Sequence, residues 1–98
     1  MNVKTHSIKF DANSKLLDFI QGKMDKLEKF FDRIVDAEVF LRLNNEGIEN
    51  KTVEIKLNLP GEQFFAESTA RSFEKAMENC FNILKRKLKE HKDKLIAH

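Results

Sequence analysis

Apolar and polar residues alternate strictly in residues 36–44 and 51–59, the pattern of strands that bury one face. The apolar positions, which we expect in the core, are Ala37, Val39, Leu41, Leu43, Val53, Ile55, Leu57 and Leu59. The positions between them should face solvent; they include Glu38, Phe40, Arg42, Thr52, Glu54, Lys56 and Asn58. These two strands would form the centre of a sheet.

Two further strands are predicted, over residues 2–9 and 63–68. In the first, Val3 and Thr5 would face one side of the strand, while Ile8 and Phe10 fall on the other phase of the alternation and would face the opposite side. This change of phase indicates a bulge or a twisted edge strand. Turn residues at 44–47 and at Pro60-Gly61 separate the last three strands. Because those connections are short, we expect an antiparallel meander.

Helical spacing of apolar residues predicts two helices. The first spans residues 14–31 with Asn13 as its N-cap, and its expected apolar face is Leu17, Ile20, Met24, Leu27 and Phe31. The second follows an N-cap at Ser72 and runs to about Leu95, with a stripe of Phe73, Met77, Cys80 or Phe81, Leu84, Leu88, His91 and Leu95. Its second half is dominated by charge and should extend past the sheet.

The element order is therefore β-α-β-β-β-α. It predicts an α+β, two-layer fold with a four-stranded antiparallel sheet and two helices on one face. The 98 residues, 41% of them hydrophobic and nine of them Phe, suffice for one core, so residues 1–98 are expected to be a single domain.

The residues offer little for catalysis or for metal binding. The single cysteine excludes an internal disulfide, and Cys80 on the apolar stripe is expected to be a buried, inert thiol. His6, His91 and His98 lack metal-ligand spacing. Phosphate loops and nucleophile motifs are missing from the sequence. We therefore expect no enzyme activity, no cofactor, no metal site and no small-molecule substrate.

The chain has the composition of a cytoplasmic protein. The first ten residues, MNVKTHSIKF, have no apolar segment typical of a signal peptide, and no apolar run approaches the length that spans a bilayer. We expect a cytoplasmic location without membrane attachment.

Positive charge is concentrated at one end of the chain. Residues 1–84 contain 12 Lys or Arg and 14 Asp or Glu, a net −2, whereas residues 85–98 contain six against two, a net +4. This asymmetry is as compatible with a solvated helix end as with nucleic-acid binding. Lys85, Lys89 and Lys92 share one helical face beside Arg86, and the first helix offers Lys26, Lys29 and Arg33, with Lys23 at the border.

If the two helices lie side by side, their basic faces could border one groove that follows a phosphate backbone. Few exposed aromatic residues accompany the basic face, which argues against a protein that stacks single-stranded bases. Recognition of folded RNA by its shape and phosphates fits better.

Two stretches resemble a known family. Residues 26–34 (KLEKFFDRI), followed by a strand, resemble the end of the first helix in the ribosome hibernation promoting factors, also called ribosome-associated inhibitors and formerly sigma-factor modulation proteins. Residues 84–95 (LKRKLKEHKDKL) resemble that family's closing basic helix. The second helix departs from the family pattern at Ser72-Phe73-Glu74 and at Ile83.

The resemblance implies a fold similar to double-stranded-RNA-binding domains. It also implies binding to the small ribosomal subunit, in the channel for messenger and transfer RNA, and silencing of translation in stationary phase or stress. The implied rRNA-contacting residues are Lys23, Lys26, Lys29, Arg86, Lys89, Lys92 and Lys94. With its end at His98 the chain resembles the short family members, and we expect it to be monomeric off the ribosome.

Two other functions fit the same residues. The chain could be a generic double-stranded RNA-binding module. It could also be a protein-interaction module that uses the exposed sheet face around Phe40 and Arg42.

Overall fold

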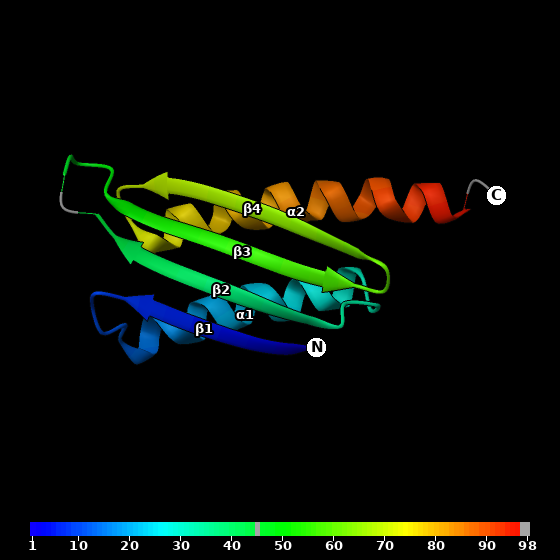
Figure 1. Cartoon of the computed structure of the whole chain (residues 1–98), viewed down its shortest axis with the longest axis horizontal. Helices are drawn as coiled ribbons and strands as arrows, with labels where there is room; N and C mark the ends of the chain where they lie inside the picture. Colours follow the sequence, from blue (N-terminus) through cyan, green and yellow to red (C-terminus); the bar gives the residue numbers. More distant parts are fainter. Residues whose placement is uncertain (45, 97–98) are drawn as a thin grey trace.

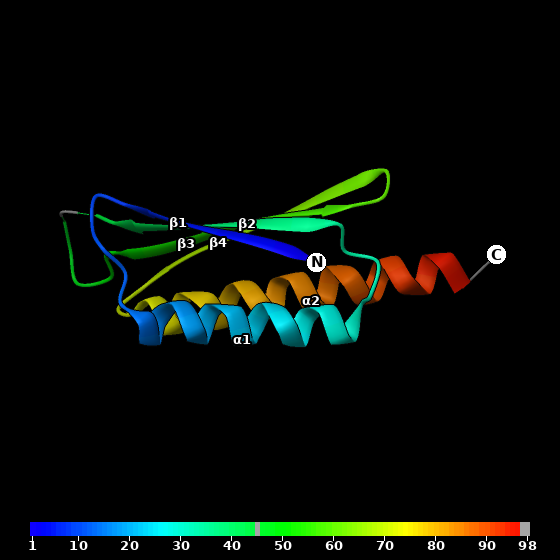
Figure 2. The same cartoon turned by 90° about the horizontal axis from the view of Figure 1, so that it is seen from below.

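Four strands and two helices follow one another in the expected order in a computed structural model, which describes residues 1–44 and 46–96. Their bounds are β1 (Asn2–Ile8), α1 (Ser14–Phe30), β2 (Asp36–Leu43), β3 (Lys51–Leu59), β4 (Glu62–Ala70) and α2 (Phe73–Ile96). Both helices cover the same face of the sheet, so the two-layer α+β fold is confirmed (Figure 1; Figure 2). Asn45 of the predicted turn and His98 lie outside the described residues.

The sheet has the order β1-β2-β3-β4 and is mixed. Strands β2, β3 and β4 form the predicted antiparallel meander, but β1 pairs with β2 in parallel, from Asn2 opposite Asp36 to Ile8 opposite Arg42. The expectation of a wholly antiparallel sheet is therefore wrong. The cause is α1, which crosses back along the sheet so that β2 starts at the same end as β1.

Strand β1 is an edge strand, as expected, but it contains no bulge. Its seven residues pair consecutively with residues 36–42. The change of phase falls at Ile8, the last residue of the strand, and the next residue, Lys9, has a φ of 68° and turns the chain. Phe10 then leaves the sheet and stacks on Phe73 at the start of α2, with ring centroids 4.9 Å apart.

Helix α1 begins as predicted, because the Leu16 N–H donates to the Asn13 side-chain oxygen at 2.9 Å. Its buried residues are Leu16, Ile20, Met24 and Leu27, and Phe31 continues the stripe just past the helix. Leu17, which the apolar spacing predicts on the core face, is 38% exposed, so that prediction is wrong. The face starts one position earlier than predicted, since steps of four from Met24 lead back to Leu16.

Helix α2 is capped by Ser72, whose hydroxyl oxygen accepts the Lys75 N–H at 3.1 Å. Its buried stripe is Phe73, Ala76, Met77, Cys80, Leu84 and Leu88. The last turns run past the end of the sheet, as predicted, and this leaves Leu95 47% exposed (Figure 1). The expected continuation of the apolar stripe to Leu95 is wrong for that reason.

The strands place their core residues as predicted, with three differences. Leu43, at the end of β2, is 37% exposed because the sheet no longer has a covering helix there. Thr52, expected to face solvent, is 7% exposed because its hydroxyl pairs with that of Thr69 at 2.8 Å and accepts from Asn44 at 3.0 Å. Strand β4 is longer than the predicted 63–68.

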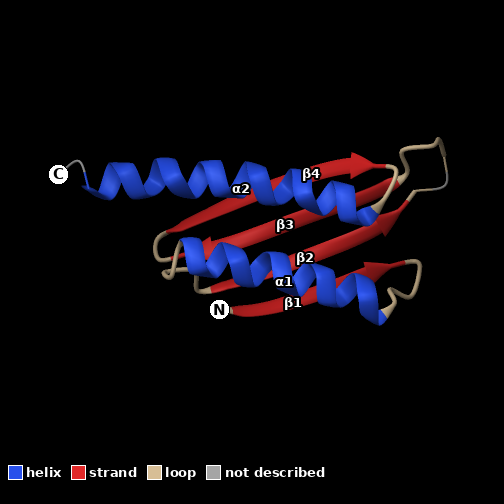
Figure 3. Ribbon diagram, turned by 180° about the vertical axis from the view of Figure 1, so that it is seen from behind, coloured by secondary structure: helices blue, strands red, loops and turns tan. Residues whose placement is uncertain are grey.

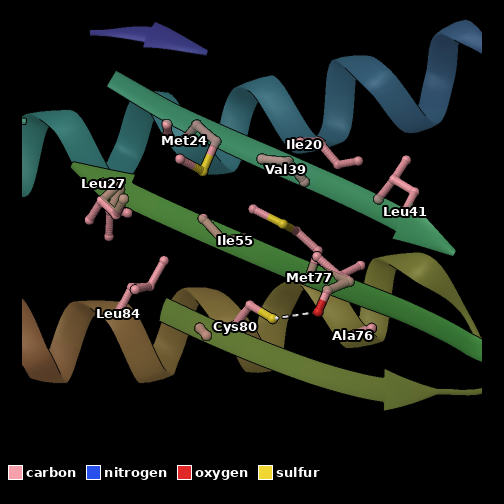
Figure 4. Packing of buried hydrophobic residues seen from close by; sticks show 14 of the residues in the cluster. Ile20, Met24, Leu27, Val39, Leu41, Ile55, Ala76, Met77, Cys80 and Leu84 are labelled. Atoms are coloured by element: carbon pink, nitrogen blue, oxygen red, sulfur yellow. Dashed lines mark hydrogen bonds between the residues drawn. The ribbon is translucent and has the colours of Figure 1, made fainter. Parts of the chain in front are cut away.

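Cys80 is buried between α2 and the sheet, where its thiol donates to the backbone oxygen of Val53 at 3.4 Å (Figure 4). Burial, and secondarily the charges of Glu67 and Glu54, raise the pKa of this thiol from 9.0 to about 12. The expectation of a buried thiol is confirmed.

We predict that Cys80 reacts slowly with iodoacetamide at pH 8 in the native state and rapidly in urea, because only the thiolate is nucleophilic. Mass spectrometry follows the alkylation; equal rates with and without urea would contradict the burial.

The raised pKa of Cys80 also affects stability, because as the pH rises the thiol deprotonates at a lower pH in the unfolded chain than in the folded one. The free energy of unfolding should therefore be insensitive to this group below about pH 9 and should fall as the pH rises from there towards 12.

Candidate nucleic-acid interface

Helices α1 and α2 lie side by side on the sheet and run in the same direction (Figure 3). At 3.6 residues per turn, Phe19, Lys23, Lys26 and Phe30 form one stripe along α1. On α2 the stripe that contains Phe81, Lys85 and Lys92 lies next to the core stripe. The contacts between these side chains show that the two stripes meet at the boundary between the helices.

Aromatic rings hold lysines at this boundary. The Lys23 Nζ lies 5.0 Å from the centroid of the Phe81 ring and 5.7 Å from that of Phe19. The Nζ atoms of Lys85 and Lys92 lie 5.4 and 4.8 Å from the centroid of the Phe30 ring. The electron-rich face of a ring attracts an ammonium group. An ammonium group has three donors, so each lysine keeps donors for an outside anion.

Two hollows open beside Phe30, which lines both. The first, which we call the terminal hollow, has a volume of about 570 Å³ and is lined by Lys29, Phe30, Phe31, Asp32, Arg33, Lys92 and Leu95. The second, of about 430 Å³, is lined by Phe30, Asn82, Lys85, Arg86 and Lys89. Together they form a continuous basic region at the C-terminal halves of the helices.

We define the basic surface as the cations of these stripes and hollows: Lys23, Lys26, Lys29, Arg33, Lys85, Arg86, Lys89 and Lys92. Within residues 1–44 and 46–96, the ion pairs involve the N-terminus, Arg42 and two histidines, and none involves a residue of this surface. Its positive charges therefore have no carboxylate partner at contact distance in that part of the chain, which favours an anionic ligand.

The structure brings together six of the seven residues singled out from the sequence. Lys29 and Lys92 line the terminal hollow, Arg86 and Lys89 line the second hollow, and Lys23 and Lys26 lie on the stripe between the helices.

Lys94 lies apart from the other six. It lines a hollow of about 290 Å³ on the β4 side of α2, together with the carboxylates of Glu62 and Glu90 and with His91. The His91 Nδ1 lies 3.2 Å from a Glu62 oxygen, and the neighbouring Lys87 donates to the Phe65 backbone oxygen at 2.8 Å. This side of α2 is held against β4 by polar contacts and is less positive than the basic surface.

Sequence reasoning missed the part played by the aromatic residues. The rings of Phe19, Phe30 and Phe81 are half-buried, and lysines of the basic surface lie against them. None of these three rings is fully exposed. A signal was available, because Phe19, Lys23, Lys26 and Phe30 follow steps of four, three and four. Arg33 and Lys85 are basic residues outside the set that the family resemblance implies, and they line the two hollows.

Two further features, metal-binding clusters and membrane-spanning helices, are not found among residues 1–44 and 46–96. His, Cys, Asp and Glu residues form no group of three or more that could hold a metal ion there. Among those residues, no helix combines the length and apolarity needed to cross a bilayer.

Comparison with known sequences gives a consistent result. A family model described as sigma 54 modulation protein / S30EA ribosomal protein matches residues 3–96. The ribosome hibernation promoting factor of Klebsiella oxytoca is 30% identical over 98 residues, which is 100% of this chain and 98% of that protein. The factor of Escherichia coli strain K12 is 31% identical over 88 residues, 90% of each chain. The Bacillus subtilis ribosome hibernation promotion factor is 26% identical over 97% of this chain and 50% of its own length.

Solved structures share the fold. A ribosomal subunit interface protein from Coxiella burnetii superposes with a TM-score of 0.85 at 18% identity, over 95% of this chain and 99% of the other. The N-terminal domain of Thermus thermophilus Protein Y gives a TM-score of 0.80 at 22% identity, over 93% and 99%. Sequence, fold and matched length agree, and the chain belongs to the sigma 54 modulation protein / S30EA ribosomal protein family, beside its shorter ribosome hibernation promoting factors.

Proposed function

We propose that this chain is a ribosome hibernation factor, a cytoplasmic, non-enzymatic protein that acts as one RNA-binding domain. It binds the small ribosomal subunit through the basic surface, contacts rRNA there, occupies the channel for messenger and transfer RNA, and silences translation in stationary phase or stress. The observation that carries this proposal is the joining of basic residues from α1 and α2 into one surface whose cations form no ion pair within residues 1–44 and 46–96. The names of its relatives support the choice of the ribosome as partner.

The surface is suited to phosphates more than to bases. Lys26, Lys29, Arg86 and Lys89 are exposed and lie on two helices that run in the same direction, so they offer charge along a strip. Cations arranged along a strip neutralise successive phosphates and release their counterions. Specificity for the ribosome would then come from the shape of folded rRNA.

We predict that binding to small subunits and to whole ribosomes weakens steeply with salt. With about six phosphate contacts, the affinity should fall by about 10³ or more between 50 and 200 mM monovalent salt. Co-sedimentation across a salt series measures this directly. Binding that tolerates salt would contradict the proposal and would favour the sheet face around Phe40 and Arg42, where Arg42 already pairs with Glu54 at 3.4 Å.

Competition separates ribosome binding from general duplex binding. We expect an excess of duplex RNA to displace the protein from small subunits poorly, whereas subunits already loaded with messenger and initiator transfer RNA should exclude it. Efficient displacement by any duplex would indicate a generic double-stranded RNA binder.

The separate position of Lys94 gives a test of the surface itself. We expect Lys29→Glu to weaken ribosome binding by about tenfold or more, and Lys94→Glu to have a clearly smaller effect, because Lys94 lies among carboxylates on the β4 side. Both side chains are exposed, so neither change should affect folding. Equal losses in co-sedimentation would extend the contact area to that side of α2.

A further inference from the structure

The terminal hollow differs in chemistry from the rest of the basic surface. The second hollow is lined by three cations, an amide and the Phe30 ring. The terminal hollow also has cations, Lys29, Arg33 and Lys92, but it adds the carboxylate of Asp32 and the apolar side chain of Leu95. A phosphate alone gains nothing from an apolar wall and is repelled by a carboxylate. The terminal hollow therefore suits a ligand that carries more than a phosphate.

The walls of this hollow are held in place. The Lys92 Nζ donates to the backbone oxygen of Phe30 at 3.3 Å while it lies near the face of the same ring. Phe31, the next residue, is only 5% exposed, and its N–H closes α1 by donating to the Leu27 oxygen at 2.9 Å. Phe30 and Lys92 are thus positioned before any ligand arrives, which reduces the entropy lost on binding.

The polar groups on the rim remain available. Asp32 and Arg33 are exposed in the turn that follows α1, and neither takes part in an ion pair within the described residues. An arginine and two lysines can hold a phosphate, and a free carboxylate accepts hydrogen bonds from an amino group. Carboxylates accept in this way from the exocyclic amino group of cytosine.

We propose that the terminal hollow binds one unpaired nucleotide. Its phosphate lies among Lys29, Arg33 and Lys92, its base lies against Phe30 and Leu95, and an exocyclic amino group donates to Asp32. The volume of about 570 Å³ falls in the range of small-ligand sites. Where that nucleotide belongs to rRNA, the inference rests on the proposed function, since it adds one base contact to a phosphate-binding surface. A free nucleotide has the same chemistry.

The first experiment follows backbone and methyl NMR signals of the whole chain during titration with 5′-CMP, 5′-UMP and ribose 5-phosphate. We expect 5′-CMP to shift the signals of Phe30, Arg33 and Leu95 and to bind more tightly than 5′-UMP, while ribose 5-phosphate binds about tenfold more weakly because it lacks the base. Equal binding of ribose 5-phosphate and 5′-CMP would overturn the proposal.

The second experiment distinguishes the two sources. Three RNA hairpins are compared, one fully paired, one with a single bulged cytidine and one with an abasic bulge at the same place. Preference for the bulged cytidine by about tenfold would identify a nucleotide within RNA. Response to 5′-CMP without this preference would identify a free nucleotide. No response in either experiment would refute the site.

Variants show whether the response comes from this hollow. Phe30→Leu keeps apolar volume but removes the ring, and it should abolish the base preference. Asp32→Asn should narrow the difference between 5′-CMP and 5′-UMP, since an amide also donates to the carbonyl groups of uracil. Phe65→Leu, at a half-exposed Phe on the sheet, is the matched control and should change nothing. If the base preference fails while ribosome co-sedimentation persists, only this inference falls; loss of co-sedimentation by the parent chain would instead remove the proposed function.

Discussion

Reversing the charge of Arg86 and Lys89 together is expected to abolish co-sedimentation with ribosomes, with an affinity loss of about 100-fold or more at 100 mM salt. Both side chains are exposed and line the second hollow, and neither forms an ion pair in the described part of the chain. Each lost phosphate contact also lowers the slope of log affinity against log salt concentration by about one. The double variant should therefore bind weakly and respond less to salt.

A matched control exists at the other end of α2. Lys75 is an exposed lysine in the first turn of α2, about 17 Å along the helix axis from Arg86 at 1.5 Å per residue, and Arg71 is an exposed arginine just before the N-cap Ser72. Arg71→Glu combined with Lys75→Glu changes the net charge by the same amount away from the basic surface. We expect most ribosome binding to remain. Equal loss in the two double variants would mean that total charge matters and that the basic surface has no special part.

The fold was largely predictable because its signals are local. Strict alternation in β2 and β3 placed the core residues from Ala37 to Leu57, and the caps at Asn13 and Ser72 set where the helices begin. The direction of β1 was not predictable from its own residues. It depends on the crossover through α1, which determines the end of the sheet to which the chain returns.

Errors at single residues have local physical causes as well. Leu16 and Leu17 are adjacent, and either could belong to the apolar face of α1. Leu16 is the buried one because of how α1 lies on the sheet. Thr52 alternates as a solvent-facing residue should, yet hydroxyl and amide partners from neighbouring segments cover it. Neither Thr69 nor Asn44 belongs to the stretch 51–59 whose alternation predicts an exposed Thr52.

The candidate site was predictable only in part, because it forms between two helices. The spacing of basic residues predicts a basic face on each helix. It does not predict that the two faces form one surface, because that depends on the helices lying side by side. The steps of the apolar face place Phe31 in the core, but they do not say where the ring of the adjacent Phe30 lies. In the structure Phe31 is buried, and Phe30 is left between Lys85 and Lys92 at the boundary. Lys94 fits the basic pattern equally well, but the turn of the helix carries it to the β4 side.

The largest expected effect on stability comes from Leu84→Ala. Leu84 is fully buried and points from α2 towards the sheet and α1 (Figure 4). Removing its side chain loses buried apolar contact and leaves a cavity, which costs about 2–5 kcal/mol. For a domain of about 100 residues the melting temperature should fall by about 10 °C or more. Thermal unfolding followed by circular dichroism measures this shift.

Leu17→Ala makes the same chemical change on α1 and serves as the control. Leu17 is 38% exposed, so we expect a loss of under about 1 kcal/mol. The comparison also tests the corrected face of α1, because a loss at Leu17 as large as that at Leu84 would mean that Leu17 packs in the core. Leu84 directly precedes the basic residues 85 and 86, so its substitution also separates folding from charge. Below its lowered melting temperature, folded Leu84→Ala protein should retain the affinity and the salt dependence of the parent. The Arg86 and Lys89 double variant should bind weakly and respond less to salt while remaining folded.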